Sequence, residues 1–330
     1  MAMQQGDWTT DMAIRAAWMS FVGGATQGEI ATRLGISNAK VHRLIAHAQR
    51  TGLVRFQIAG RPSDCLEIEA ALITEWGLSS CLIAPDIGAG GDLSEDSDIR
   101  AIAALAGPHL ANLVSNSGIS QLGVGMGRTL KATVEQMPRV QRPDLRIVSI
   151  SGSLTRKLSA NPFDVVQQLA ERTGGEGFYL PVPYLAESAA ERDMFLGQRS
   201  VQALLERARA SDLFVIGIGS VEDDSHLIRR DLISRDEQRD LIASGAVCDL
   251  MGRFIGRDGM LVGAKLGEKA VGLPFEAVRG SRVVALSGGL GKLEATRAAL
   301  RAGLITDLIV DESLGRALVS AKGKQQARSA

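Results

Sequence analysis

Three glycine-rich stretches have residue types and spacings that suit the binding of an anionic ligand. The first, "GVGMGRTL" at residues 123–130, has three glycines before Arg128 and Thr129. Glycines let the backbone approach a ligand closely, and the N–H groups at the start of a helix attract anions. The sequence therefore predicts a phosphate-binding loop formed by Gly123, Gly125, Gly127, Arg128 and Thr129.

The other two stretches add Gly152 from "SISGSL" (149–154) and Lys292 from "SGGLGKLEA" (287–295). Lys292 is not part of a P-loop, because the four-residue gap before Gly-Lys is missing and Leu293 stands where a Ser or Thr would bind magnesium. The G-x-G-x-G order at 123–127 also differs from the dinucleotide fingerprint. We expect no cofactor. Each cluster alone also suits a plain turn; together with the two cations they favour a binding site.

Asp249, in "GAVCDLMGRF" (245–254), follows an apolar stretch, and burying it without a partner would be costly. Two roles remain open for it: a general base, or an acceptor of hydrogen bonds from sugar hydroxyls. The chain has no G-x-S-x-G elbow. His109 lies in an apolar helical segment and His226 in the charged run "EDDSHLIRRD". This small number of candidate catalytic residues favours a protein that is not an enzyme. The acidic pair at 223–224 is typical of a solvated surface, so we expect no metal site.

A different chemistry is indicated in "TQGEIATRLGISNAKVHRLI" at 26–45. Residues 26–58 carry five Lys or Arg against Glu29 alone, a net charge of +4 in a chain that is neutral overall. A local basic surface of this kind is the electrostatic footprint of DNA binding. The predicted DNA contacts are Thr26, Gln27, Ser37, Asn38, Lys40, His42 and Arg43.

A helix-turn-helix would position these side chains. Thr26 and Glu29 form a capping-box pattern, Gly35 permits a tight turn, and Ser37 is a second N-cap candidate. The apolar residues expected between the helices are Ile30, Ala31, Leu34, Ile36, Val41, Leu44, Ile45 and Ala48.

A preceding helix from Asp11 is expected to bury Ile14, Ala17, Trp18 and Phe21. The alternation at 52–60 predicts a wing-like strand or hairpin. The alternative for the whole module is a three-helix cap with a solvated basic face.

The rest of the sequence, residues 61–330, predicts a large α/β domain. Continuous apolar segments separated by helices such as 98–115 indicate a doubly wound, mainly parallel sheet. The predicted strands are 80–86, 119–125, 144–151, 177–183, 212–219, 281–289 and 306–312. Ligands bind beyond the carboxyl ends of such strands, where the glycine clusters fall. A Gly/Pro/Ser break at 60–64 divides the chain into predicted domains at 1–60 and 61–330.

Composition agrees with a two-domain globular protein, with 45% hydrophobic and 22% charged residues among 330. The three cysteines, Cys65, Cys81 and Cys248, are far apart and lack metal-binding spacing, which favours a reducing compartment. No signal-peptide pattern or run of ~20 apolar residues occurs. We expect a cytoplasmic protein with no membrane partner.

The order of these motifs resembles the SorC/DeoR family of sugar-responsive bacterial transcription regulators. The resemblance extends over nearly the whole chain, from the pair at 26–45 through "GVGMGRTL", "SISGSL", "PVPYLAES" (181–188), "FVIGIGS" (214–220) and "GAVCDLMGRF" to the block at 282–312. The last block and the Gly-Arg-Thr loop are its most specific parts.

The resemblance implies an N-terminal DNA-binding domain and a C-terminal effector domain related to sugar-phosphate isomerases and deaminases, assembled as homodimers or homotetramers on operator DNA. It implies effector contacts at Gly125–Thr129, Lys292 and Asp249. Such regulators serve sugar or polyol operons, including that of erythritol. The sequence departs from the family in two places. Residues 37–43 read Ser-Asn-Ala-Lys-Val-His-Arg instead of Ser-Arg-Pro-Thr-Val-Ser-Arg, and Met126 replaces a common tryptophan.

Two hypotheses follow from the sequence. The first is a regulator of a carbohydrate or polyol operon that is controlled by a sugar, a sugar phosphate or a polyol. The second is a sugar-phosphate isomerase-like enzyme with an appended DNA-binding module. The thin catalytic inventory favours the first.

Overall fold

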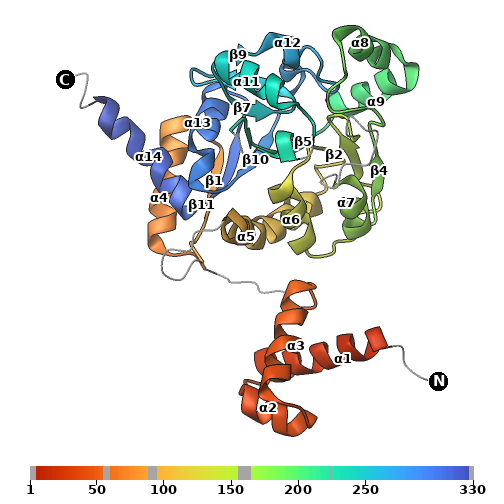
Figure 1. Cartoon of the computed structure of the whole chain (residues 1–330), viewed down its shortest axis with the longest axis vertical. Coiled ribbons are helices and arrows are strands. Elements are labelled where there is room, and N and C mark those ends of the chain that lie inside the picture. Colours follow the sequence, from red (N-terminus) through yellow and green to blue (C-terminus); the bar gives the residue numbers. More distant parts are fainter. Residues whose placement is uncertain are drawn as a thin grey trace. The chain divides into compact units, whose positions relative to one another are not determined.

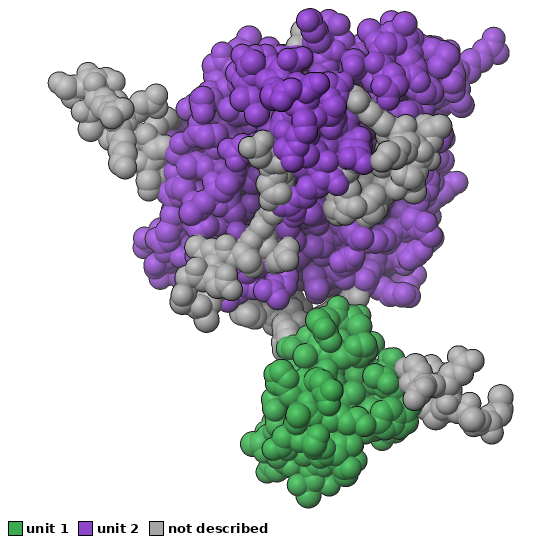
Figure 2. All heavy atoms as spheres, in the orientation of Figure 1, with its two compact units in different colours: residues 1–58 green, residues 59–330 purple. Residues whose placement is uncertain are grey.

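The computed structural model describes residues 5–54, 60–87, 95–154, 165–222, 225–229 and 231–326 of the chain. The chain forms two compact units, Met1–Ile58 and Ala59–Ala330 (Figure 2). In its described part the smaller unit contains only helices, and the larger combines helices with strands (Figure 1).

The smaller unit consists of α1 (Gln5–Ala17), a π-helical turn η1 (Trp18–Val22), α2 (Gln27–Leu34) and α3 (Asn38–Arg50). Its predicted caps are confirmed. Thr26 Oγ1 accepts a hydrogen bond from the Glu29 N–H, and the Glu29 carboxylate accepts one from the Thr26 N–H. Ser37 Oγ accepts a hydrogen bond from the Lys40 N–H. Gly35 ends α2 with a φ of 65°, which a side chain would disfavour.

The predicted inner face of α2 and α3 is also confirmed. Most of its members are buried, and Leu34 and Ile36 pack at its margin. The stripe predicted on the first helix is wrong at three of its four positions. Trp18 is 64% exposed, and Ile14 and Phe21 are also exposed.

The buried face of α1 is formed instead by Ala13, Ala16 and Ala17. These small side chains let α1 approach its neighbours closely. The π-helical turn then rotates the residues after Ala17 away from α-helical spacing. Residues 55–59 of the wing predicted at 52–60 lie outside the described residues.

The larger unit is built on a seven-stranded sheet of order β1-β11-β10-β5-β2-β3-β4, in which every pair is parallel. Its strands are β1 (Ser80–Ala84), β2 (Gln121–Val124), β3 (Arg146–Ser149), β4 (Glu176–Phe178), β5 (Leu213–Gly217), β10 (Val283–Ser287) and β11 (Asp307–Asp311). Six of the seven predicted strands are confirmed. The seventh, at 177–183, is limited to β4, because Pro181 and Pro183 lack the N–H that a ladder needs.

The helices of this unit are α4 (Ser63–Trp76), α5 (Glu95–Ser115), α6 (Arg128–Gln136), α7 (Val166–Thr173), α8 (Ala189–Gly197), α9 (Arg199–Arg209), α10 (His226–Arg229), α11 (Arg235–Ala243), α12 (Ala264–Gly267), α13 (Leu293–Arg301) and α14 (Glu312–Gln326). Two 3₁₀ turns, η2 (Phe275–Val278) and η3 (Leu290–Lys292), complete them.

Helices cover both faces of the large sheet. Successive side chains of a strand point to opposite faces. On β5, Leu213 and Val215 pack into the cluster formed with α5, α6 and α7, whereas Phe214 and Ile216 pack into the cluster formed with α4, α13 and α14. The predicted doubly wound, parallel sheet is therefore confirmed.

A second sheet was not predicted. It is antiparallel, with order β6-β7-β8-β9, and consists of β6 (Gly219–Ser220), β7 (Ala246–Leu250), β8 (Arg253–Gly256) and β9 (Leu261–Val262). β6 and β9 have two residues each, which is too few to show alternation in a sequence. Because β6 follows β5 almost directly and places Gly219 opposite Asp249, this sheet brings Asp249 to the carboxyl end of β5.

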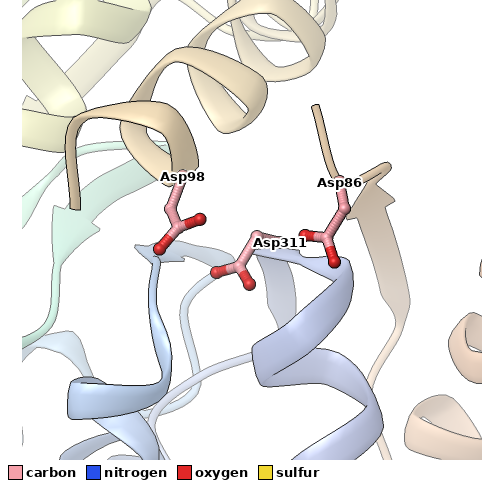
Figure 3. Close-up of side chains that lie close together, drawn as sticks. All are labelled: Asp86, Asp98 and Asp311. Carbon is pink, nitrogen blue, oxygen red and sulfur yellow. The ribbon is translucent and has the colours of Figure 1, made fainter. Parts of the chain in front are cut away.

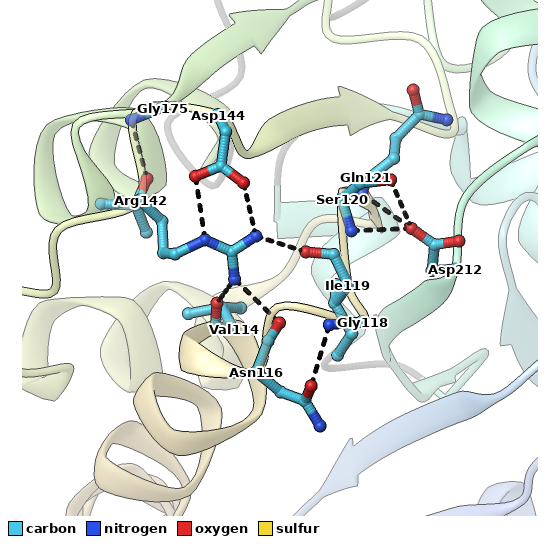
Figure 4. A network of polar contacts seen from close by, with 11 residues as sticks. Val114, Asn116, Gly118, Ile119, Ser120, Gln121, Arg142, Asp144, Gly175 and Asp212 are labelled. Carbon is cyan, nitrogen blue, oxygen red and sulfur yellow. Dashed lines mark hydrogen bonds and ion pairs between the residues drawn. The ribbon is translucent and has the colours of Figure 1, made fainter.

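Hydrogen bonds of two charged side chains fix the opposite end of β2 (Figure 4). The Arg142 guanidinium donates hydrogen bonds to the carbonyl oxygens of Val114, Asn116 and Ile119, which closes the end of α5. The Asp212 carboxylate accepts the N–H groups of residues 120 and 121 at the start of β2. The strand that leads into the 123–130 loop is thereby held at its beginning.

Candidate functional site

The strand order of the large sheet reverses between β2 and β5. β3 and β4 lie on one side of β2, and β5, β10 and β11 lie on the other. In such sheets a crevice opens at the carboxyl ends of the strands at this reversal. A cavity lies at this place, lined by residues from the loops after β2, β3, β5 and β10 and by residues of the small sheet.

Six of the eight residues predicted to bind the ligand line this cavity. They are Gly125, Gly127, Arg128, Thr129, Asp249 and Lys292. The other two lie outside the lining, at close packing contacts. A Cβ on Gly123 would lie 2.6 Å from the Phe214 ring, and a Cβ on Gly152 would collide with the Pro183 carbonyl.

Two cations line the cavity, Arg128 and Lys292. Arg128 is the first residue of α6, and no side chain caps this helix because Gly127, with a φ of 141°, precedes it. Lys292 ends η3 directly before α13, and its Nζ lies 3.1 Å from Ser220 Oγ of β6. Two positive side chains and a helix N-terminus suit an anionic group.

The cavity is also lined by Asp249, which is only 3% exposed. Its carboxylate accepts a hydrogen bond from Tyr184 Oη, 3.1 Å from Oδ1, and another from the Gly252 N–H at 3.0 Å. Burial raises the pKa of Asp249 to about 6, although these hydrogen bonds and the charge of Lys292 lower it. The group is therefore an acceptor whose proton affinity is higher than that of an exposed carboxylate.

His226, from the short helix α10, lies beside Asp249. Its Nε2 lies 3.7 Å from Asp249 Oδ2. Burial and the nearby charges of Lys292 and Arg128 lower the pKa of His226 to about 3, so the imidazole is neutral at pH 7 and the contact is not an ion pair. A neutral imidazole offers one donor and one acceptor, which suits a hydroxyl ligand.

Sequence reasoning missed Tyr184 and His226. His226 follows β5 and β6, and the ends of buried parallel strands mark the ligand edge of a sheet, so its position was an available signal. Tyr184 lies in an irregular, proline-rich stretch with no periodic pattern. Asp223 and Asp224 lie outside the described residues.

Apolar groups form the remaining wall, among them Met126, Ile216 and Leu286. Met251 also lines the cavity. It has a φ of 57° and forms with Gly252 the two-residue turn between β7 and β8. The cavity thus combines cations, paired donors and acceptors, and apolar surface, as expected for a site that holds a small polar metabolite.

Three carboxylates meet beside this region, at the ends of β1 and β11 and in the first turn of α5 (Figure 3). They belong to Asp86, Asp98 and Asp311. Asp311 accepts hydrogen bonds from the N–H groups of Gly289 and Leu314. It therefore ties the loop after β10, which leads to Lys292, to the start of α14.

The smaller unit exposes part of the predicted DNA-contact set. Asn38, His42 and Arg43 are exposed on α3, and Gln27 is exposed at the start of α2. Thr26 and Ser37 use their hydroxyls as helix caps. The ammonium of Lys40 lies 4.6 Å from the centre of the Trp8 ring of α1.

Among the described residues, no helix has the length and apolar character needed to cross a membrane. Residues 60–320 match the protein family described as "Putative sugar-binding domain". The chain is 37% identical over 308 residues to the erythritol catabolism regulatory protein EryD of Brucella abortus, covering 93% of this chain and 96% of that protein. It is 29% identical to the transcriptional regulator LsrR of Escherichia coli, with 96% of each chain covered.

Solved structures agree with this match. The full-length sorbitol operon regulator SorC of Klebsiella pneumoniae has the same fold, with a TM-score of 0.70 at 21% identity over 94% of this chain and 98% of that one. A domain of a possible sugar-binding transcriptional regulator of Arthrobacter aurescens is 26% identical, with a TM-score of 0.70 over 79% of this chain and all of that domain. The chain belongs to the family of transcriptional regulators that carry this sugar-binding domain.

Proposed function

We propose that the protein binds operator DNA through its N-terminal domain, residues 1–60, and that a sugar, a sugar phosphate or a polyol controls this binding from a site in residues 61–330. The observation that carries the proposal is the cavity, whose lining combines the cations Arg128 and Lys292 with the hydrogen-bonding side chains of Asp249, Tyr184 and His226. The names of EryD and SorC refer to erythritol catabolism and to the sorbitol operon.

The charges favour a phosphorylated effector. Arg128, Lys292 and the start of α6 would bind the phosphate oxygens, together with Gly125, Gly127 and Thr129. Asp249 would accept hydrogen bonds from hydroxyls, and the neutral His226 would donate or accept one. The wall formed by Met126 and its neighbours would pack against the carbon chain.

DNA binding would use α3 as the recognition helix. Asn38, His42 and Arg43 are exposed on it, and Lys40 adds a charge at its first turn. Gln27, Thr26 and Ser37 would contact phosphates near the two helix starts. A helix-turn-helix protein that reads a two-fold operator needs two copies, so we propose a homodimer or homotetramer.

A shift assay on the gene's own upstream DNA tests the recognition helix. Lys40→Ala and Arg43→Ala should each weaken binding and reduce the salt slope by about one, because each removes one cation that neutralises a DNA phosphate. Arg15→Ala is the matched control, since Arg15 lies on α1 in an ion pair with Asp11. Unchanged affinity and salt slope in both α3 variants would show that α3 does not contact DNA.

The alternative function, a sugar-phosphate isomerase, rests on Asp249 with its raised pKa beside a neutral imidazole. Its test is turnover of pentose and hexose phosphates by the purified protein. Turnover that Asp249→Asn abolishes would replace the effector role of the cavity with catalysis.

A further inference from the structure

A second cavity lies at the small sheet and shares no lining residue with the first. Two arginines meet in it, Arg192 from α8 and Arg253, the first residue of β8. Phe254 of β8 and Leu261 and Val262 of β9 form an apolar wall. Guanidinium groups that converge on one cavity repel each other unless an anion lies between them.

Arg253 is the more informative of the two. Its Nη1 donates to the Gly267 carbonyl at 2.6 Å. Within the described ranges it forms no ion pair with a carboxylate, and its other donors have no protein partner. Burial lowers the pKa of Arg253 and the positive charge of Arg192 lowers it further, whereas Tyr184 and Glu276 act in the other direction. A largely buried cation without a carboxylate is costly, and proteins normally pair such a charge.

Arg192 supplies a second guanidinium that is only partly engaged. Its Nε forms an ion pair at 2.8 Å with Asp193 Oδ1, and the Asp193 side chain is 65% exposed. Glu268 also lines the cavity but is exposed and forms no ion pair with either arginine in the described part of the chain. The charge of Glu276 raises the pKa of Arg253.

We propose that this cavity is a second ligand site, which takes an oxyanion, the phosphate or carboxylate group of a small metabolite, between Arg192 and Arg253. Planar guanidiniums bind such groups through paired N–H donors. The apolar wall would contact the carbon chain of the ligand. The site is separate from the effector cavity, because Arg128 and Lys292 belong to that cavity alone.

Calorimetric titration of the full-length protein with inorganic phosphate, and separately with pyruvate, tests the proposal. Arg192→Ala should weaken one binding event at least tenfold, and Arg253→Lys should do the same because a lysine cannot form a fork. Arg239→Ala is the matched control, since Arg239 is exposed on α11 and paired with Asp236. Lys292→Ala should remove only the event that belongs to the effector cavity. Thermal melts of each variant check that it is folded.

The outcomes separate this inference from the proposed function. The second site would be overturned if folded Arg192→Ala bound both anions as the wild type and Arg239→Ala do. This result would leave the proposal for the effector cavity unchanged. If Arg192→Ala loses a binding event and the isotherms of Lys292→Ala match those of the wild type, the second site is supported. The same result would contradict phosphate binding in the effector cavity. A response to only one of the two anions identifies the group that the site accepts.

Discussion

Asp249 is a buried carboxylate, and burial disfavours its charged form. In the unfolded chain an aspartate has a pKa near 3.9, whereas burial raises the pKa of Asp249 to about 6. Below about pH 4 the group is protonated in both states and carries no penalty. Between pH 4 and 6 the unfolded state loses its proton first, so the free energy of unfolding falls as the pH rises, and the penalty is complete above pH 6.

Asp249→Asn should remove this penalty. The Asn oxygen can still accept the hydrogen bonds from Tyr184 and from the Gly252 N–H, while the charge is absent. We expect the free energy of unfolding to rise by about 2–3 kcal/mol at pH 8 and to change little below pH 4. Denaturant titrations of both proteins between pH 4 and 8 measure the difference. A variant that is less stable than the wild type at pH 8 would mean that the carboxylate charge stabilises the fold.

Residue chemistry explains which parts of the cavity the sequence could predict. Arg128 and Lys292 each follow a glycine turn after an apolar strand, so their place at the ligand edge was readable. Asp249 was predicted as a site residue from the apolar stretch that precedes it. Tyr184 and His226 reach the cavity through an irregular segment and a four-residue helix, and no spacing rule connects either with Asp249.

At the scale of elements, α1 contacts a side chain of the proposed recognition helix α3. Its Trp8 ring lies against the ammonium of Lys40, the residue proposed to contact DNA from the first turn of α3. A cation over an exposed aromatic ring gains about 0.5–1 kcal/mol. The ring would hold the Lys40 side chain in place, and a side chain already ordered loses less entropy when it binds.

A double-mutant cycle tests this role of Trp8. Trp8→Ala should weaken DNA binding about two- to fivefold in the wild type and have no effect in the Lys40→Ala background, because its action passes through Lys40. Trp18→Ala, which removes another exposed tryptophan of the same helical segment, should leave affinity unchanged. Additive effects of the Trp8 and Lys40 substitutions would show that the two act independently.

Elements with a continuous apolar run or a recognisable cap were predictable, and the shortest strands were not. Continuous apolar runs identified the strands of the parallel sheet, and Thr26 and Ser37 identified the starts of α2 and α3. The small sheet escaped prediction because β6 and β9 have two residues each. The apolar face of the first helix was assigned wrongly at Trp18 and Phe21 because periodicity cannot reveal a π-helical turn such as η1, and at Ile14 because alanines form the buried face of α1.

At the scale of the whole molecule, the proposed DNA contacts and the cavity belong to different compact units. Coupling between two such sites is a free energy, and it must act equally in both directions. An effector that changes DNA affinity tenfold therefore represents about 1.4 kcal/mol of coupling, and operator DNA must change effector affinity by the same factor.

The most direct test of this account measures the affinity of the full-length protein for its own upstream DNA in the presence of erythritol, sorbitol and their phosphates. We predict that at least one of these compounds changes wild-type affinity tenfold or more. Lys292→Ala should keep the ligand-free affinity and lose the response, because it removes a cation of the cavity and no residue of the smaller unit. A response that persists in Lys292→Ala, or no response of the wild type to any of the four compounds, would contradict the account.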